Sequence, residues 1–208
     1  MYIPKSFEVT DKEKIFDFVR RNSFAILFSQ LEGHPFATHL PLLVDESRGE
    51  NGILLGHMAK ANPHWKNLNG QEVLAVFQGP HAYISPTWYK ESNTVPTWNY
   101  VAVHIYGDFK LIENKQEMIE IIDKTGDYYE SSMPNPWKAD FDDRFTDGLM
   151  NGIACFEIDI MRFEGKWKLN QNHSAERQQN AVIGLRTQTD ENSVEIANLM
   201  AENLSFKK

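Results

Sequence analysis

The sequence has few of the features that cross-link a chain or anchor it in a membrane. Its single cysteine, Cys155, permits no internal disulfide, and the surrounding Ile153-Ala154-Cys155-Phe156 is typical of a packed strand. No apolar run approaches the roughly 18 residues of a membrane span. The first residues also lack the basic and apolar regions of a signal peptide. The sequence therefore predicts a cytoplasmic protein without a membrane segment.

Positive charge is also scarce. The 208 residues include 21 Lys and Arg against 29 Asp and Glu, which gives a formal charge of −8. Because affinity for a phosphate backbone comes mainly from clustered Lys and Arg, this balance argues against direct DNA binding and leaves a regulatory protein partner as the alternative. The nearest candidate for a recognition helix is 175–185, which has no basic flank beyond Arg186. Its polar residues are Glu176, Arg177, Gln178, Gln179 and Asn180.

Several catalytic signatures are missing. The sequence contains no Gly-x-Gly-x-x-Gly, P-loop, Gly-x-Ser-x-Gly or His-Glu-x-x-His motif, which sets aside the corresponding enzyme classes. Among the seven histidines, only His57 and His64 fall within ten residues in a plausible shared region, and no pair with zinc-ligand spacing accompanies them. We expect no bound metal.

What the sequence does contain is a series of short β-rich runs behind one helix. Thr10-Asp11-Lys12-Glu13 forms a capping box before a helical apolar pattern, which predicts a helix over 11–21. The runs that follow are separated by turn residues and predict an antiparallel barrel or meander. They are Phe24–Ser29, Phe36–Val44, Ile53–Met58, Val73–Phe77, Ala82–Ser85 and Trp98–Phe109.

Helices interrupt and complete this β-rich pattern. Asn114 caps a predicted helix to about Tyr129, and a second helix is expected over Ala139–Met150. Ile153–Phe163 returns to strand alternation. Helices are then expected over Ala175–Leu185 and over Val194–Leu204, the latter preceded by Asn192. The whole chain, 1–208, is expected to be a single α+β domain that is mainly β, with a helical insertion at about 114–150 and C-terminal helices at about 175–204.

A candidate anion site follows the predicted strand Ile53–Met58. Asn62 is a good N-cap and Pro63 a favoured first helical residue, so a short helix should begin there with unpaired amides pointing outward. Those amides, with Lys60 beside them, could hold a dianionic phosphate. The alternative is an ordinary capped helix with a solvated lysine, and the segment by itself leaves both open.

Two aromatic-rich segments, 79–89 and 95–100, provide flat apolar walls with amide and hydroxyl groups nearby. Such walls suit a planar heterocycle. Alternatively, Trp88, Trp98 and Tyr100 fill a barrel core or a dimer contact.

Seven segments together resemble the PaiB family, and they occur in order between residue 1 and about residue 185. The chain departs from the family pattern at Asn172-His173, where an arginine would be expected after the asparagine. The segments are Met1-Tyr2-Ile3-Pro4, Ala37-Thr38-His39-Leu40-Pro41, Gly56-His57-Met58-Ala59-Lys60-Ala61-Asn62-Pro63-His64-Trp65, Gly79-Pro80-His81-Ala82-Tyr83-Ile84-Ser85-Pro86, Val95-Pro96-Thr97-Trp98-Asn99-Tyr100, Val103-His104-Ile105-Tyr106-Gly107 and Gly165-Lys166-Trp167-Lys168-Leu169-Asn170-Gln171-Asn172.

The resemblance implies an antiparallel split β-barrel of the FMN-binding type, related to the pyridoxamine phosphate oxidase group. It also implies a homodimer with FMN at the subunit interface. By resemblance, the FMN phosphate would lie near Lys60 and the amides from Asn62 onward, and either His57 or His64 would pair with it or steer a proton. The implied flavin-binding residues are His39, His57, Met58, Ala59, Lys60 and Asn62, with Tyr83, Ser85, Thr97, Trp98 and Asn99 from the partner subunit and Lys168 and Gln171 closing the site.

The function implied by the resemblance is negative transcriptional regulation of sporulation and of degradative-enzyme (protease) synthesis, through redox or ligand sensing. Three other functions stay open at this stage. They are a flavin-dependent oxidoreductase of the pyridoxamine phosphate oxidase-like group, a haem-binding split barrel and a structural dimer with a vestigial site. The sequence names no catalytic residue.

Overall fold

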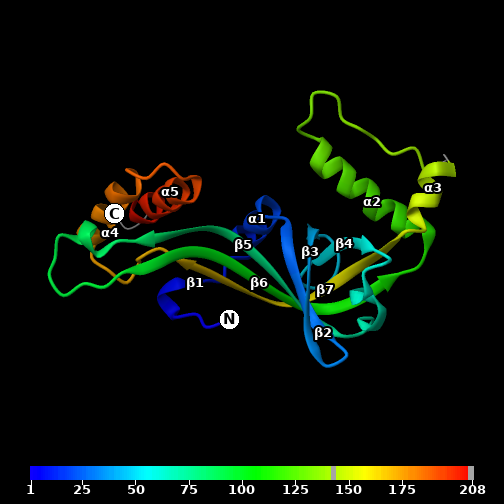
Figure 1. Cartoon of the computed structure of the whole chain (residues 1–208), viewed down its shortest axis with the longest axis horizontal. Helices are drawn as coiled ribbons and strands as arrows, with labels where there is room; N and C mark the ends of the chain where they lie inside the picture. The colour runs from blue at the N-terminus through cyan, green and yellow to red at the C-terminus, as the bar shows by residue number, and fades with distance from the viewer. Residues whose placement is uncertain (142–143, 206–208) are drawn as a thin grey trace. The chain divides into compact units, whose positions relative to one another are not determined.

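The computed structural model describes residues 1–141 and 144–205, and its contacts divide the chain into two compact units (Figure 1). Unit 1 consists of Met1–Phe18, Gln78–Val103 and Glu164–Lys208, and unit 2 of Val19–Phe77 and His104–Phe163.

An antiparallel sheet of seven strands forms the framework, in the order β1-β7-β4-β3-β2-β5-β6. Strand β7 pairs with β6 as well as with β4, so the strands form a partial ring. This topology confirms the predicted antiparallel split barrel of an α+β protein. The strands are β1 (Glu8–Val9), β2 (Phe24–Leu31), β3 (His34–Asp45), β4 (Ile53–Ala59), β5 (Glu72–Ile84), β6 (Thr97–Ile112) and β7 (Ile153–Lys168).

Strands β2 to β7 are all longer than the sequence pattern predicts, and β5 and β7 differ most. Strand β5 runs unbroken through Gly79-Pro80, where the sequence suggested a break between two strands. The alternation of buried residues shifts by one position between Phe77 and Pro80, as at a β-bulge, and this shift hid the continuity. Strand β7 continues to Lys168, five residues beyond the predicted end at Phe163.

In unit 2, helix α2 (Lys115–Glu130) begins at the predicted cap, where Asn114 Oδ1 accepts from the backbone amides of Gln116 and Glu117. Ile121 of this helix joins a buried cluster with Leu55 of β4 and Cys155 of β7. Burial raises the pKa of the Cys155 thiol to about 12, so this cysteine is a core residue, as predicted.

Helix α3 (Arg144–Met150) begins later than the predicted Ala139, and residues 142–143 of that prediction lie outside the described residues. Asp140 directly follows the predicted start and lies outside the helix, and aspartate favours caps over helix interiors.

In unit 1, helix α4 (Ala175–Leu185) has the predicted bounds, but α5 (Glu191–Ser205) begins three residues before the predicted Val194. Asp190 Oδ1 accepts from the amide of Ser193 at 2.9 Å and therefore acts as the N-cap. Asn192, which the sequence pattern placed ahead of the helix, instead accepts from the amide of His81 at 3.3 Å. The remaining helices are α1 (Lys12–Arg21) and the 3-10 helices η1 (Lys5–Phe7), η2 (Pro63–Asn67) and η3 (Pro86–Tyr89).

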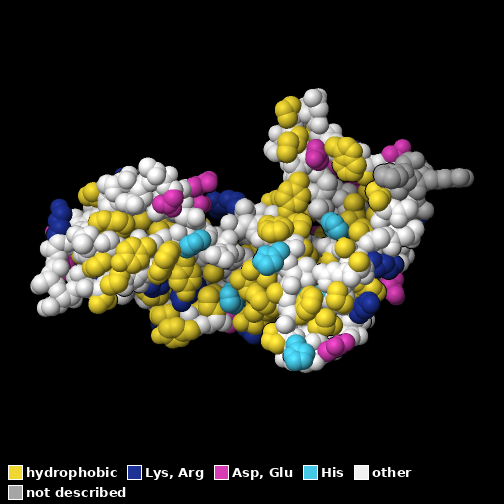
Figure 2. Space-filling view, viewed as in Figure 1, with side chains coloured by type: hydrophobic (Ala, Val, Ile, Leu, Met, Phe, Trp, Pro, Cys, Tyr) yellow, Lys and Arg dark blue, Asp and Glu magenta, His cyan; other side chains and the backbone are white. Residues whose placement is uncertain are grey.

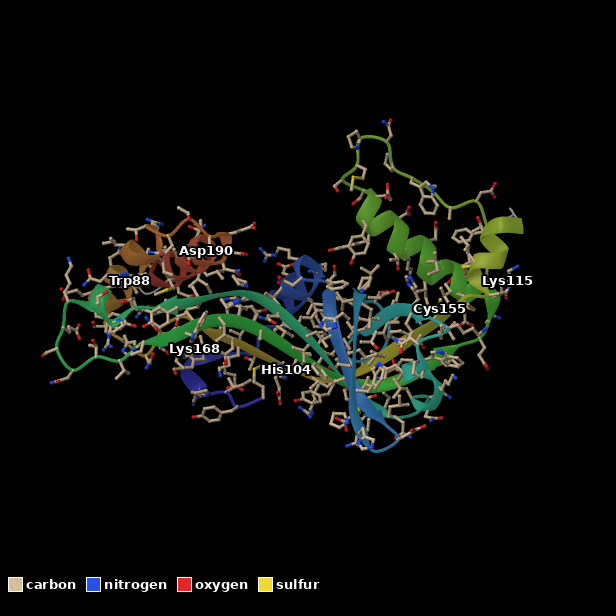
Figure 3. The ribbon with its side chains drawn as sticks, viewed as in Figure 1. Trp88, His104, Lys115, Cys155, Lys168 and Asp190 are labelled. Atoms are coloured by element: carbon tan, nitrogen blue, oxygen red, sulfur yellow. The ribbon has the colours of Figure 1, made fainter. Side chains whose placement is uncertain are left out.

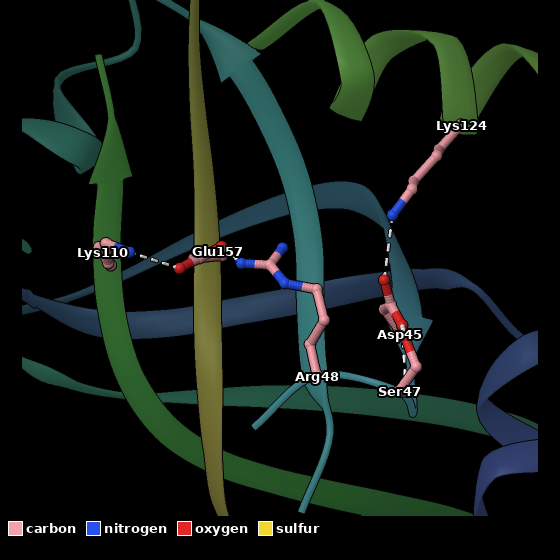
Figure 4. A network of polar contacts seen from close by, with 6 residues as sticks. All are labelled: Asp45, Ser47, Arg48, Lys110, Lys124 and Glu157. Carbon is pink, nitrogen blue, oxygen red and sulfur yellow. Dashed lines mark hydrogen bonds and ion pairs between the residues drawn. The ribbon is translucent and has the colours of Figure 1, made fainter. Parts of the chain in front are cut away.

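A buried carboxylate, Glu157 of β7, carries two ion pairs in unit 2 (Figure 4). Arg48 Nη2 and Lys110 Nζ each lie 2.8 Å from one of its oxygens. Burial raises the pKa of Glu157, but the hydrogen bonds from Lys110 and Arg48 outweigh it, so the pKa lies below its ordinary value. The neighbouring Asp45 likewise has a lowered pKa, because it accepts from Ser47 and pairs with Lys124.

Replacing Glu157 with glutamine is expected to lower the free energy of unfolding at pH 7 by about 1 to 2 kcal/mol, because both cations stay partly hydrated. A lowered pKa stabilises the fold above the ordinary carboxyl pKa of about 4.3, and this contribution is lost as the pH falls through the folded-state value. The difference between wild type and variant in urea unfolding should therefore shrink below about pH 4. Glu50→Gln, at an exposed position, is the matched control. If the unfolding free energies of wild type and Glu157→Gln differ equally at pH 7 and at pH 3, the lowered pKa of Glu157 is contradicted.

Candidate functional site

The end of β4 presents alternate side chains to opposite faces of the sheet. His57 is half-buried and Ala59 exposed, whereas Met58 is buried between them. Burial lowers the pKa of His57. Of the predicted segment His57-Met58-Ala59, only His57 and Ala59 therefore offer side-chain surface to a ligand. Met58 could contribute backbone groups alone.

The turn after β4 is capped as predicted but is less open than expected. Asn62 Oδ1 accepts from the amide of His64 at 3.0 Å, and Pro63 has no amide hydrogen. The helix is also a short 3-10 helix, Pro63–Asn67, with little dipole. The amide of Asn62 also donates, to the carbonyl of Ala59 at 2.9 Å. The prediction of unpaired amides is therefore wrong at Asn62, Pro63 and His64, because none of the three has a free amide hydrogen.

His64 is fully buried and both of its ring nitrogens are engaged. Nε2 lies 2.6 Å from Ser29 Oγ of β2, and Nδ1 lies 2.8 Å from Thr38 Oγ1 of β3. Asn62 Nδ2 donates to the same Thr38 oxygen at 3.0 Å. Burial lowers the pKa of His64. The ring thus joins β2, β3 and η2, and in this conformation it is not available to pair with a phosphate.

Lys60 lines a pocket of about 410 Å³ within unit 2. The indole of Trp65 forms one wall and is held in place because its Nε1 donates to the carbonyl of Lys60 at 3.1 Å. Lys115, at the start of α2, also lines the pocket (Figure 3). Apolar side chains also line it, among them Met118, Met150 and Ile153, and Glu113 adds one carboxylate. The pocket thus combines two lysines and one carboxylate with an apolar wall.

His39 lies on β3, the strand next to β4, and its ring is exposed. The nearest aromatic partner is Phe24 of β2, with ring centroids 6.4 Å apart. Phe24 is itself 66% exposed. His39 is therefore accessible, and it lies beside an uncovered aromatic group.

In unit 1, Lys168 of β7 connects several predicted site residues (Figure 3). Its Nζ donates to Thr97 Oγ1 at 2.5 Å and to the carbonyl of Trp98 at 2.6 Å. Burial, with the charge of Lys166 second, lowers the pKa of Lys168. Gln171 closes the turn that follows, because it donates to the carbonyl of Trp167 and accepts from the amide of Leu169.

The aromatic members of the unit 1 set gather at one surface. Tyr83 and Trp98 have ring centroids 6.1 Å apart in an edge-to-face arrangement, and both rings are about half exposed. Figure 2 shows hydrophobic side chains gathered over the strands of this unit. Ser85 has a local role, because its hydroxyl caps η3 by accepting from the amide of Thr87 at 3.3 Å.

Asn99 differs from the other predicted site residues. Its side chain is fully buried, Nδ2 faces the sulfur of Met200 at 3.3 Å, and Oδ1 has no hydrogen-bond partner among the described residues. Strand alternation explains this placement: Trp98 faces outward, so the next residue faces inward. Asn99 offers no surface to a ligand in this conformation.

The chain is similar to a known protein family over most of its length. Residues 1–162 match the model of the family described as "Putative FMN-binding domain". The chain is also 38% identical over 206 residues to the protease synthase and sporulation protein PAI 2 of Bacillus subtilis, covering 98% of each chain. The chain belongs to this FMN-binding-domain family. The resemblance to the PaiB family is thereby confirmed.

Relatives of this family member extend beyond bacteria. An uncharacterised protein of Emericella nidulans is 27% identical over 230 residues, covering 91% of this chain and 92% of the relative. Among solved structures, the FAD and haem binding protein of Mycobacterium smegmatis has a TM-score of 0.62 at 15% identity, covering 84% and 79% of the two chains. The flavocytochrome Anf3 of Azotobacter vinelandii has a TM-score of 0.60 at 15% identity, covering 80% and 72%. These structures share the fold.

The family departure at His173 lies in a polar cluster of unit 1. The His173 ring is 6.1 Å from Tyr89, and the guanidinium of Arg177 lies 4.0 Å from the centre of the same tyrosine ring. Burial, with the charge of Arg177 second, lowers the pKa of His173. Gln178 is fully buried and donates to the carbonyl of His173 at 2.7 Å. Arg177 and Gln178 of α4 thus both contact other residues of unit 1.

The sequence pattern missed several residues of this family member that line pockets. Lys115 follows the Asn114 cap, so its position at the first turn of α2 was readable, but its proximity to Lys60 was not. Trp65, Met150 and Asp190 were missed as well, because the sequence pattern does not show which residues line the same pocket. Within the described residues, no three His, Cys, Asp or Glu side chains are placed to hold a metal ion. No described helix is long and apolar enough to cross a membrane.

Proposed function

We propose that this protein binds FMN as a homodimer and regulates protease synthesis and sporulation negatively, through redox or ligand sensing in the cytoplasm. The observation that carries the proposal is the match of residues 1–162 to the FMN-binding-domain family. The name of the Bacillus subtilis relative supports the regulatory part. When bound, FMN would supply reversible electron transfer.

The pocket beside Lys60 fits one end of such a ligand. Lys60 and Lys115 provide positive charge, as a phosphate requires, and Trp65 and Met118 provide an apolar wall. Its volume of about 410 Å³ lies within the range of ligand pockets. We therefore propose that Lys60, with Lys115, holds the phosphate. His57 and Ala59 would face the ring, with backbone groups of Met58, and His39 would lie beside it.

The polar groups of unit 1 are proposed as the contribution of the partner subunit. Lys168 donates to Thr97, and Gln171 donates to the carbonyl of Trp167, so these side chains would meet a ligand in a fixed arrangement. Exposed aromatic side chains on β2, Phe24 and Phe28, support a subunit interface, because such residues are enriched where subunits meet.

Lys60→Ala is expected to weaken FMN binding by about 10- to 100-fold, because a charge-assisted contact to the phosphate is lost. The measurement is quenching of FMN fluorescence on titration with protein, after an absorbance scan from 300 to 700 nm. Riboflavin, which lacks the phosphate, should bind wild type and variant alike. Lys66→Ala, at an exposed lysine of η2, is the matched control.

Other results would redirect the proposal. Unchanged FMN affinity in Lys60→Ala would remove this lysine from the site. A Soret band after purification would favour haem, and oxidation of a nicotinamide by the FMN-loaded protein would favour an oxidoreductase. A monomer in light scattering would contradict the shared site.

A further inference from the structure

A second pocket, of about 330 Å³, lies entirely within unit 1 and has a different chemistry. Its walls come from β5, η3, β6 and the segment that leads into α5. Aromatic rings dominate one side and the start of α5 the other. The side chains that matter for recognition are His81, Tyr83, Trp88, Trp98 and Asp190.

The aromatic rings are fixed but uncovered. Trp98 is 53% exposed and Tyr83 47% exposed, and the His81 ring lies 6.0 Å from that of Trp98. Trp88 is pressed against α4, because a Cβ at Gly184 would lie 2.2 Å from its indole. The exposed parts of Trp98 and Tyr83 would gain free energy if they were buried. Their surfaces are therefore available for a ligand.

The side chains that line the pocket carry one formal charge, which is negative, and the nearest cation named above is Lys168, whose Nζ donates to the carbonyl of Trp98 at 2.6 Å. Of the described residues that line it, Asp190 alone carries a carboxylate, and none is a lysine or an arginine. Asp190 accepts a hydrogen bond from the amide of Ser193, and hydrogen bonding to the Ser193 side chain, with that to the amide second, lowers the pKa of Asp190. Figure 3 labels Trp88 and Asp190 in this unit.

An anionic ligand would be disfavoured here. The first turn of α5 has a positive dipole end, but Asp190 caps it and takes the amide of Ser193. Aromatic faces carry a negative quadrupole, so they add to the repulsion of an anion and attract a cation.

We propose that this pocket binds a small organic ammonium cation, with the alkylated nitrogen against the faces of Trp98, Trp88 and Tyr83 and its charge balanced by Asp190. Aromatic faces beside a carboxylate are the arrangement by which proteins bind quaternary ammonium groups. The proposal uses only side chains within unit 1, and two of them, Tyr83 and Trp98, are also among the flavin-binding residues that the family resemblance implies.

The test is an equilibrium titration of the full-length protein with choline as the probe, followed by tryptophan fluorescence. Dimethylbutanol, in which a carbon replaces the quaternary nitrogen, is the uncharged comparison. Choline should bind saturably with a dissociation constant on the order of 1 mM, and dimethylbutanol at least about tenfold more weakly.

Two variants separate charge from ring contact. Asp190→Asn keeps a good N-cap for α5 and should weaken choline binding about 5- to 30-fold without changing thermal stability. Trp98→Leu keeps an apolar side chain but removes the aromatic face, and should weaken it similarly. Trp137→Phe, at an exposed tryptophan of unit 2, is the control and should bind like wild type. Equal binding of choline and dimethylbutanol, or unchanged choline affinity in both variants, would overturn the proposal.

Discussion

Replacing Gly107 with alanine is expected to destabilise the protein by about 3 kcal/mol or more, one of the largest effects of any single methyl group in this fold. Gly107 lies on β6, and a Cβ there would be 2.2 Å from the backbone carbonyl oxygen of Asp159 on β7. It would also be 2.7 Å from Cγ2 of Ile158. A backbone carbonyl cannot rotate away as a flexible side chain can, so the two strands would have to separate.

For a domain of this size, the loss corresponds to a fall in melting temperature of about 6 to 12 °C. Thermal and urea unfolding followed by fluorescence measure it. Gly126→Ala is the matched control, because a Cβ at Gly126 on α2 meets nothing within 4 Å. That variant should be neutral or more stable by up to about 1 kcal/mol. Equal stabilities of Gly107→Ala and Gly126→Ala would show that β6 and β7 are not as close as described.

The second large effect is expected for His64→Ala, at about 3 kcal/mol of lost stability. The substitution leaves a cavity at a fully buried position and removes the partner of Ser29 on β2 and of Thr38 on β3. It also removes the contact with Phe36, whose ring centroid lies 4.8 Å away. Urea unfolding at pH 7.5 measures the loss, and His34→Ala, at an exposed histidine of the same unit, should change stability by less than about 0.5 kcal/mol.

His64 should also contribute to the dependence of stability on pH. Because burial lowers its pKa, the folded state favours the neutral ring, whereas the unfolded chain takes up a proton below about pH 6.5. Its contribution is therefore complete above that pH and is lost as the pH falls toward the folded-state value. His64→Gln should flatten the fall in stability between pH 6.5 and 5. His57 and His173 have lowered pKa values as well and will retain part of the slope. An unchanged slope would mean that His64 is not buried as described.

Local signals predicted most of the elements of the fold. The cap at Asn114 and the helical pattern of Ala175–Leu185 are properties of consecutive residues, and both helices begin where the pattern indicates. The errors occurred where two local signals competed. Gly79-Pro80 is a turn signal within strand β5, and Asp190 competed with Asn192 as the cap of α5.

The candidate site was predictable only in part. Lys60 and the capping role of Asn62 were readable from the chain, but the burial of Asn99 and the engagement of His64 by two hydroxyl groups were not. These facts depend on which face of a strand is covered and on which strand lies opposite. No spacing along the chain reports either.

The sequence by itself determined the α+β class, the antiparallel barrel, the core role of Cys155 and the family. These follow from alternation, capping residues and ordered segments, all of which act over short distances along the chain. Tertiary structure decided that Glu157 pairs with Arg48 and Lys110. It also decided which residues line the same pocket: Lys60 and Lys115 in one, and Tyr83, Trp98 and Asp190 in the other. Contacts between residues distant in the sequence depend on strand order and packing, which many sequences with the same local pattern would not share.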